Sequence, residues 1–160
     1  MITKGTIKKL AQERIDELDK NLFIVEIAIA KGNQIKVELD RLDNNVSIDD
    51  CVSVSRNIEH NLDREKEDFE LNVSSAGLDK PFRVKEQYLK NKGEEIKVLF
   101  KDQSKSKLVG KLLDVKDDYI IVEETRKERL EGRKKKVTVT EEHKIDFKEI
   151  KETKIVISFK

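Results

Sequence analysis

The chain is poor in the residues that mark several common kinds of site and fold. Its 160 residues include one cysteine, one proline, one methionine and no tryptophan, and aromatic residues make up 5%. A single cysteine can form no internal disulfide and supplies no pair of thiolates for a CxxC metal site. No apolar run approaches membrane-spanning length, and the N-terminal MITKGTIKK lacks the apolar segment of a signal peptide. These absences favour a cytoplasmic protein with no membrane segment.

Charge is abundant but unevenly distributed. Charged residues make up 42% of the chain and hydrophobic residues 36%. Residues 1–82 carry 12 Lys and Arg against 17 Asp and Glu, whereas residues 83–160 carry 22 against 16. Opposite net charges suggest two modules with different partners, because a basic surface suits phosphate and an acidic one suits a basic protein. Two ordinary solvated surfaces would give the same imbalance.

Hydrophobic periodicity predicts an α-β-β-α-β first module over residues 1–82. Residues 2–18 show the spacing of an amphipathic helix. Two alternating strands follow, at residues 22–30 and 35–39, joined by a turn at Lys31-Gly32-Asn33. In the first strand, one face is expected to carry Phe23, Val25, Ile27 and Ile29. With a third strand, this order predicts a small α/β sandwich.

The second helix of this module is expected to begin after Ser47, a good N-cap residue. Its acidic first turn suits the positive end of the helix dipole. At helical spacing, one apolar face collects Ile48, Cys51, Val52, Ile58 and Leu62. Cys51 is therefore interpreted as a core thiol rather than a reactive one.

Residues 83–160 have a different pattern, that of a small β-barrel. A short helix is expected at 84–90 and a helical turn at 147–150. Short strands with tight turns are expected at residues 95–100, 108–115, 119–124, 137–140 and 155–159. Five short strands in under 80 residues are typical of a closed barrel, and the spacing does not separate an SH3-like barrel from an OB barrel.

A search for catalytic and metal-binding groups finds no convincing arrangement. Ser74 and Ser75 lack the Gly-x-Ser-x-Gly elbow, and the chain has no Walker loop or dinucleotide fingerprint. His60 and His143 stand alone in the sequence, without ligand-spaced partners. The chain is therefore expected to be no enzyme, with no catalytic residue, metal or cofactor.

The stretch FELNVSSAGLDKPF, residues 69–82, joins the two modules. Apolar and polar residues alternate from Phe69 to Val73, which predicts a strand, and the small residues Ser74–Gly77 then allow a sharp change of direction. Pro81, the only proline, biases Lys80 to an extended conformation. These residues by themselves fit either an interdomain connector or a binding loop.

The segment VSSAGLDKP in this stretch resembles VSSPGLDRP of the ribosome maturation factor RimP family. The helix segment DCVSVSR (Asp50 to Arg56) and the Ile-Lys-x-x-Lys-Ile pattern at Ile150–Ile155 match as well, so the resemblance covers nearly the whole chain. Ala76 stands where the family usually has proline, and Lys80 where it usually has arginine. Lysine keeps the charge but lacks the planar fork of arginine.

The resemblance implies a non-enzymatic factor that binds the immature small (30S) ribosomal subunit and promotes its maturation. It also implies an SH3-like (Sm-like) barrel for residues 83–160. The implied partners are rRNA and a basic ribosomal protein, and the chain is expected to act as a monomer. An Sm-like RNA-binding regulator acting on free transcripts is the alternative function.

Two groups of residues are candidates for partner binding. The first lies in the turn: Ser74, Ser75, Gly77, Asp79 and Lys80. The second lies in the charged segment 125–136: Arg126, Arg129, Arg133, Lys134 and Lys135. Cations there could follow a phosphate backbone, although interleaved glutamates also suit a solvated loop. Asp79 is expected to fix the turn by accepting backbone N–H bonds, and direct contact with the partner is the alternative.

Overall fold

The computed structural model describes residues 1–77, 79–128, 132 and 136–157. The fold is α+β, and its described elements are mostly strands, arranged in two sheets with three α-helices. The chain divides into two compact units, Met1–Gly77 and Leu78–Lys160. None of the described helices combines the length and the apolar character that a membrane-crossing segment needs.

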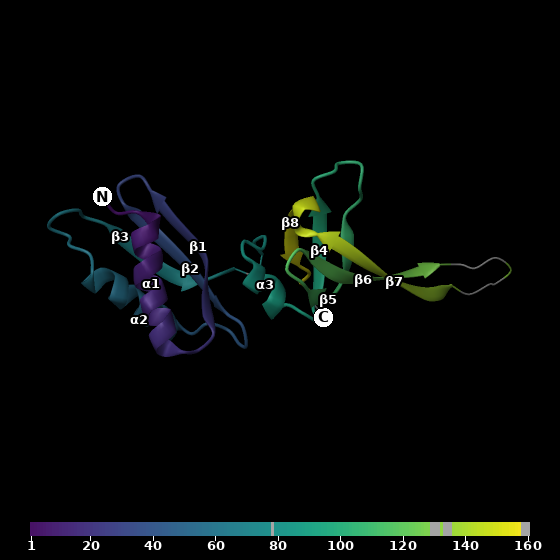
Figure 1. Cartoon of the computed structure of the whole chain (residues 1–160), viewed down its shortest axis with the longest axis horizontal. Coiled ribbons are helices and arrows are strands. Elements are labelled where there is room, and N and C mark those ends of the chain that lie inside the picture. The colour runs from purple at the N-terminus through teal and green to yellow at the C-terminus, as the bar shows by residue number, and fades with distance from the viewer. Residues whose placement is uncertain (78, 129–131, 133–135, 158–160) are drawn as a thin grey trace. The chain divides into compact units, whose positions relative to one another are not determined.

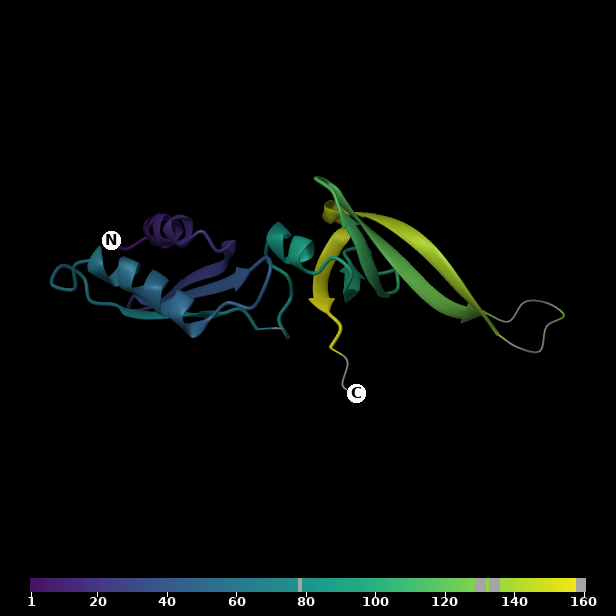
Figure 2. The ribbon, with the colours of Figure 1, turned by 90° about the horizontal axis from the view of Figure 1, so that it is seen from below.

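The first unit packs two helices on a three-stranded sheet, in the predicted α-β-β-α-β order. Its elements are α1 (Lys4–Leu18), β1 (Leu22–Ala30), β2 (Gln34–Arg41), α2 (Ile48–His60) and β3 (Glu70–Ser75). The sheet order is β1-β2-β3, with an antiparallel β1–β2 hairpin and a parallel β2–β3 pair. Both helices lie on the same face of this sheet (Figures 1 and 2).

A β-bulge in β1 changes which side chains enter the core. Ile24 pairs with Leu39, but Glu26 already pairs with Glu38, so one extra residue lies between them. An extra residue reverses the alternation of side chains, and the prediction of one common face for Phe23 and Ile27 is therefore wrong. The apolar residues of β1 that pack in the core cluster with the two helices are Leu22, Ile24, Ile27 and Ile29, whereas Phe23 and Val25 are also buried but lie outside that cluster.

The buried side of α2 also differs from the prediction. Cys51, Val54 and Ile58 are buried, with the three- and four-residue spacing of one helix face. Ile48 and Val52 lie beside this stripe and are 82% and 40% exposed, so their assignment to the core face is wrong. Cys51 is confirmed as a core thiol, and burial raises its pKa.

The second unit is an antiparallel five-stranded sheet preceded by a short helix. Its elements are α3 (Lys85–Lys90), β4 (Glu95–Phe100), β5 (Leu108–Val115), β6 (Tyr119–Glu128), β7 (Val137–Asp146), the 3-10 helix η1 (Phe147–Glu149) and β8 (Ile150–Ile155). The sheet order is β7-β6-β5-β4-β8. The last strand begins earlier than predicted because residues 150–155 pair with β4.

Aromatic rings attach the start of this unit to its sheet. Tyr88 of α3 lies between Phe82 and Phe147, with ring centroids 5.0 and 5.2 Å away. The Tyr88 hydroxyl donates to Thr153 Oγ1 at 2.8 Å, and the backbone N–H of Phe82 donates to the carbonyl oxygen of the same threonine at 2.7 Å. Phe82 therefore packs within the second unit, although the sequence placed the boundary after it.

β6 and β7 continue together beyond the rest of the sheet. Pairing between β5 and β6 ends at Glu123, whereas β6 and β7 stay paired out to Glu128 and Val137. The outer part of the hairpin is therefore a two-stranded ribbon (Figures 1 and 2). Strand pairing extends through Thr125–Glu128, which the sequence analysis assigned to a loop.

Candidate partner-binding site

The C-terminal end of β3 carries the first candidate residues. Ser74 pairs with Glu38 of β2 and is half-buried, and Ser75 pairs with Leu39 and is exposed. The backbone N–H of Ala76 continues the ladder by donating to the carbonyl oxygen of Leu39 at 2.9 Å. The serines are thus held by sheet pairing and not by a flexible loop, and Gly77, exposed, ends the first unit.

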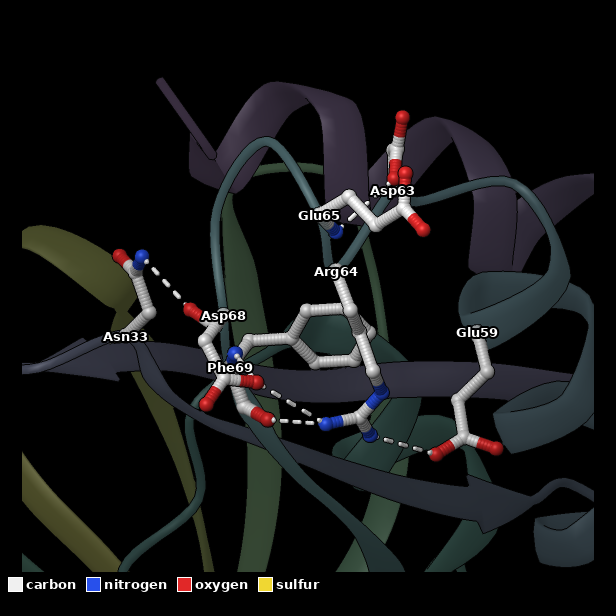
Figure 3. A network of polar contacts seen from close by, with 7 residues as sticks. All are labelled: Asn33, Glu59, Asp63, Arg64, Glu65, Asp68 and Phe69. Atoms are coloured by element: carbon white, nitrogen blue, oxygen red, sulfur yellow. Dashed lines mark hydrogen bonds and ion pairs between the residues drawn. The ribbon is translucent and has the colours of Figure 1, made fainter.

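At the other end of β3, Arg64 makes the contacts that hold the connection between α2 and β3 in place (Figure 3). Its guanidinium lies over the Phe69 ring, 4.1 Å from the centroid, and donates to the Phe69 carbonyl oxygen at 2.8 Å. It also pairs with Asp68 at 3.3 Å and with Glu59 at 3.2 Å, and Asn33 donates to the Asp68 carbonyl oxygen at 3.0 Å. These contacts fix where β3 begins and so help set the position of the serines at its end.

Asp79 and Lys80 belong to the second unit by the contacts that divide the chain, and both are exposed. In the part of the chain that the structure describes, no hydrogen bond or ion pair involves the Asp79 carboxylate. The turn-fixing hydrogen bond expected from the sequence is therefore not found. The alternative, direct contact of Asp79 with a partner, stays a prediction.

We accordingly expect Asp79→Ala to change the free energy of unfolding by less than about 0.5 kcal/mol, as is usual for exposed side chains without local contacts. Urea unfolding at neutral pH measures this change in the free energy of unfolding directly. A variant that loses partner binding at unchanged stability would place Asp79 on a docking surface. A midpoint shift corresponding to about 1.5–3 kcal/mol would restore the turn-fixing role.

The second candidate group is only partly within the described residues. Arg126 lies on β6, and its guanidinium contacts Glu124 at 2.9 Å and Glu141 at 2.7 Å. These two carboxylates neutralise the positive charge of Arg126 within the ribbon. The hydrogen bond and the charge of Arg126 lower the pKa of Glu141. Four predicted cations lie outside the described residues: Arg129, Arg133, Lys134 and Lys135.

Contrary to the expectation from the sequence, His143 does not stand alone. Cross-strand pairing places its Nε2 3.2 Å from Glu124 and 3.9 Å from Glu141, with potential ligand atoms of all three residues within 4.8 Å of one another. The Arg126 guanidinium contacts both carboxylates and so already supplies their counter-charge. This arrangement is better described as an ion-pair network than as a metal centre.

Three lysines that no sequence pattern singled out lie around one groove of the second unit. Lys105, Lys107 and Lys144 come from the β4–β5 connection and from β7. The outermost two, Lys105 and Lys144, are 39 positions apart in sequence, and no motif links them. Only the register of the strands could have indicated their proximity.

Taken together, these features define a mixed α+β protein with two compact units, an acidic half and a basic half, and a protruding β-ribbon. Residues 10–79 match the family model described as the RimP N-terminal domain. The chain is 39% identical to the ribosome maturation factor RimP of Christiangramia forsetii over 156 residues, covering 98% of this chain and 99% of that protein. It belongs to the RimP family.

Other relatives extend the comparison. The ribosome maturation factor RimP of Flavobacterium psychrophilum is 38% identical over 159 residues, covering 99% of this chain and 100% of that protein. That of Porphyromonas gingivalis is 40% identical over 135 residues, covering 84% and 87%. The similarity thus includes both units and extends well beyond the N-terminal family model.

Proposed function

We propose that this protein is a ribosome assembly factor that binds the immature small (30S) ribosomal subunit and promotes its maturation without catalysing a reaction. The observation that carries this proposal is the near full-length similarity to proteins named ribosome maturation factor. We also propose that the protein is cytoplasmic and monomeric. An Sm-like RNA-binding regulator acting on free transcripts is the second candidate, favoured by the strand order of the second unit.

We further propose that the two units, Met1–Gly77 and Leu78–Lys160, are independent domains, the first an α/β sandwich and the second an SH3-like (Sm-like) barrel. The sheet order β7-β6-β5-β4-β8 supports the barrel, because it sets the last strand beside the first. The 3-10 helix before β8 and the helix before β4 also suit such a barrel. The shared core of Ile96, Leu112 and Ile145, drawn from β4, β5 and β7, is consistent with closure.

The mechanism proposed is differential affinity. A factor that binds the immature subunit more tightly than the mature one shifts the population of subunit conformations toward those that can mature. It then dissociates, because its affinity for the product is lower. No covalent step is required.

We propose a division of contacts that follows charge. The acidic first domain and the turn residues Ser74, Ser75, Gly77, Asp79 and Lys80 would meet a basic ribosomal protein. The charged segment 125–136 would approach rRNA through Arg129, Arg133, Lys134 and Lys135. We assign Arg126 mainly to holding the ribbon, since Glu124 and Glu141 face each other across the strands and Arg126 relieves their repulsion.

Co-sedimentation in sucrose gradients tests this function. The full-length chain should migrate with small-subunit precursors and less with mature subunits. Replacing Arg133, Lys134 and Lys135 by glutamine should weaken precursor binding and reduce the salt slope by up to about 0.7–0.9 log units per lost phosphate contact.

The matched control replaces Lys4, Lys8 and Lys9, three exposed lysines of α1, by glutamine. This variant has the same net charge as the ribbon variant and should keep the affinity and slope of the wild type. Equal losses in both would mean that overall charge, not the ribbon, governs binding. Association with free transcripts in the absence of precursor binding would replace the assembly role with the regulator.

A further inference from the structure

The second unit contains a groove whose described lining residues include none of the candidate partner-binding residues. Its volume is about 380 Å³, and it is lined by the end of β4, the β4–β5 connection, the start of β5, and parts of β6, β7 and η1. Its apolar lining consists of half-buried Phe100 and of Leu108 and Ile145, which are almost fully buried, and Lys105, Lys107 and Lys144 provide positive charge. The backbone N–H of Lys101 donates to the Glu149 carbonyl oxygen at 2.9 Å, which joins the end of β4 to η1 at the groove.

The positive charge of the groove is only partly neutralised. Its two carboxylates already have partners: Glu124 contacts Arg126, and Glu149 lies 3.8 Å from Lys105. In the described part of the chain, no carboxylate lies within 4.0 Å of the ammonium group of Lys107 or Lys144. Both lysines are exposed, and the Lys144 ammonium group lies 4.3 Å from the centroid of the Tyr119 ring, so an anionic ligand could reach both lysines without breaking an ion pair.

The apolar surface includes an aromatic ring. Phe100 is half-buried at the end of β4, and the ammonium group of Lys105 lies 5.5 Å from its ring centroid. A planar base can stack on such a ring, and flexible lysines around it can contact the adjoining phosphates. A cationic groove beside an aromatic surface is the combination that single-stranded nucleic acid requires.

We propose that this groove binds single-stranded RNA, with a base against Phe100 and backbone phosphates at Lys107 and Lys144. An acidic peptide would satisfy the lysines but would leave the aromatic surface without a planar partner. None of the described residues that line the groove is among the candidate partner-binding residues assigned above, and the site would add a second RNA contact on the same domain. That the RNA is ribosomal rests on the proposed function, whereas binding to single-stranded RNA does not.

The test is fluorescence anisotropy with a labelled single-stranded uridine oligonucleotide and the full-length chain at several salt concentrations. Replacing Lys107 and Lys144 by glutamine should weaken binding about tenfold and reduce the salt slope by about 0.7 log units per lost phosphate contact. Phe100→Leu, which keeps apolar packing but removes the ring, should weaken binding at least about fivefold and leave the slope unchanged.

The matched control replaces Lys111 and Lys151, exposed lysines of β5 and β8 that do not line the groove. It should bind like the wild type, and equal weakening in the control would overturn the groove assignment. Absence of oligonucleotide binding by the wild type would overturn the proposal, as would displacement by polyglutamate as effective as by unlabelled RNA.

Co-sedimentation of the same variants separates this proposal from the assembly function. Oligonucleotide binding that depends on Lys107 and Lys144, in a protein that does not bind subunit precursors, would support the groove and contradict the assembly role. Precursor binding without any oligonucleotide binding would support the assembly role and overturn the groove.

Discussion

Gly110→Ala is expected to destabilise the second unit by about 3 kcal/mol, at the upper end of what overpacking costs. A Cβ atom added at Gly110 would lie 2.8 Å from Val122 Cγ1 and closer still to the carbonyl oxygen of Glu123. The carbonyl belongs to the backbone of β6, which is fixed by its pairing with β5 and β7. The clash can therefore be relieved only by moving a strand.

Urea unfolding followed by backbone amide NMR measures this effect separately for each unit. Signals of the second unit should disappear at lower urea, while those of residues 1–77 should keep their midpoint. Simultaneous unfolding of both units would contradict the proposed independence of the domains. An unshifted midpoint would mean that β6 yields at Gly110 at little cost.

Gly5→Ala is the matched control for Gly110→Ala. Gly5 lies in α1, and the nearest atom to an added Cβ is Thr3 Oγ1 at 3.8 Å. Because alanine is favoured over glycine in helices by up to about 1 kcal/mol, this variant should be neutral or slightly stabilised.

Asp50→Ala is expected to lower the stability of the first unit by about 2–4 kcal/mol. The Asp50 side chain is 2% exposed and accepts from Lys20 at 3.1 Å and from the Ser47 backbone N–H at 3.2 Å. Ser47 Oγ accepts in return from the Asp50 N–H at 3.0 Å, which completes a capping box. Alanine removes the ion pair and half of the cap together.

The loss of stability in Asp50→Ala should depend on pH. Burial alone would raise the pKa of Asp50, but the hydrogen bonds from Lys20 and Ser47 outweigh it and hold the pKa below its usual value. A lowered folded-state pKa gives stability that is present above the unfolded value, about 3.9, and is lost as pH falls through the folded value. Urea midpoints of wild type and Asp50→Ala should therefore converge in acid.

The neighbouring aspartate provides the comparison. Asp49 occupies the same helix turn but is exposed, so Asp49→Ala should cost no more than about 0.3–1 kcal/mol from the helix dipole. Equal losses for the two variants, or an Asp50 effect that persists unchanged in acid, would contradict the buried ion-pair interpretation.

The order of elements could be predicted well because it depends on local rules. Alternation identified β1, β2 and β3, and Ser47 caps α2 as expected. The hairpin turn is confirmed by left-handed backbone at Gly32 and Asn33, with φ of 82° and 55°. Each of these signals lies within a few residues of the structure it specifies, so neighbouring sequence was sufficient.

The sequence by itself determined two units of opposite charge, their helices and strands, and membership of the RimP family through the Val73–Pro81 stretch. Only the tertiary structure decided what depends on register and strand approach. One extra residue in β1 exchanged its faces, and the close approach of β6 to β5 left no room for a Cβ atom at Gly110. Cross-strand pairing brought His143 to Glu124, and strand packing brought Lys144 to Lys107. Such neighbours are set by pairing between distant segments, which periodicity within one segment does not encode.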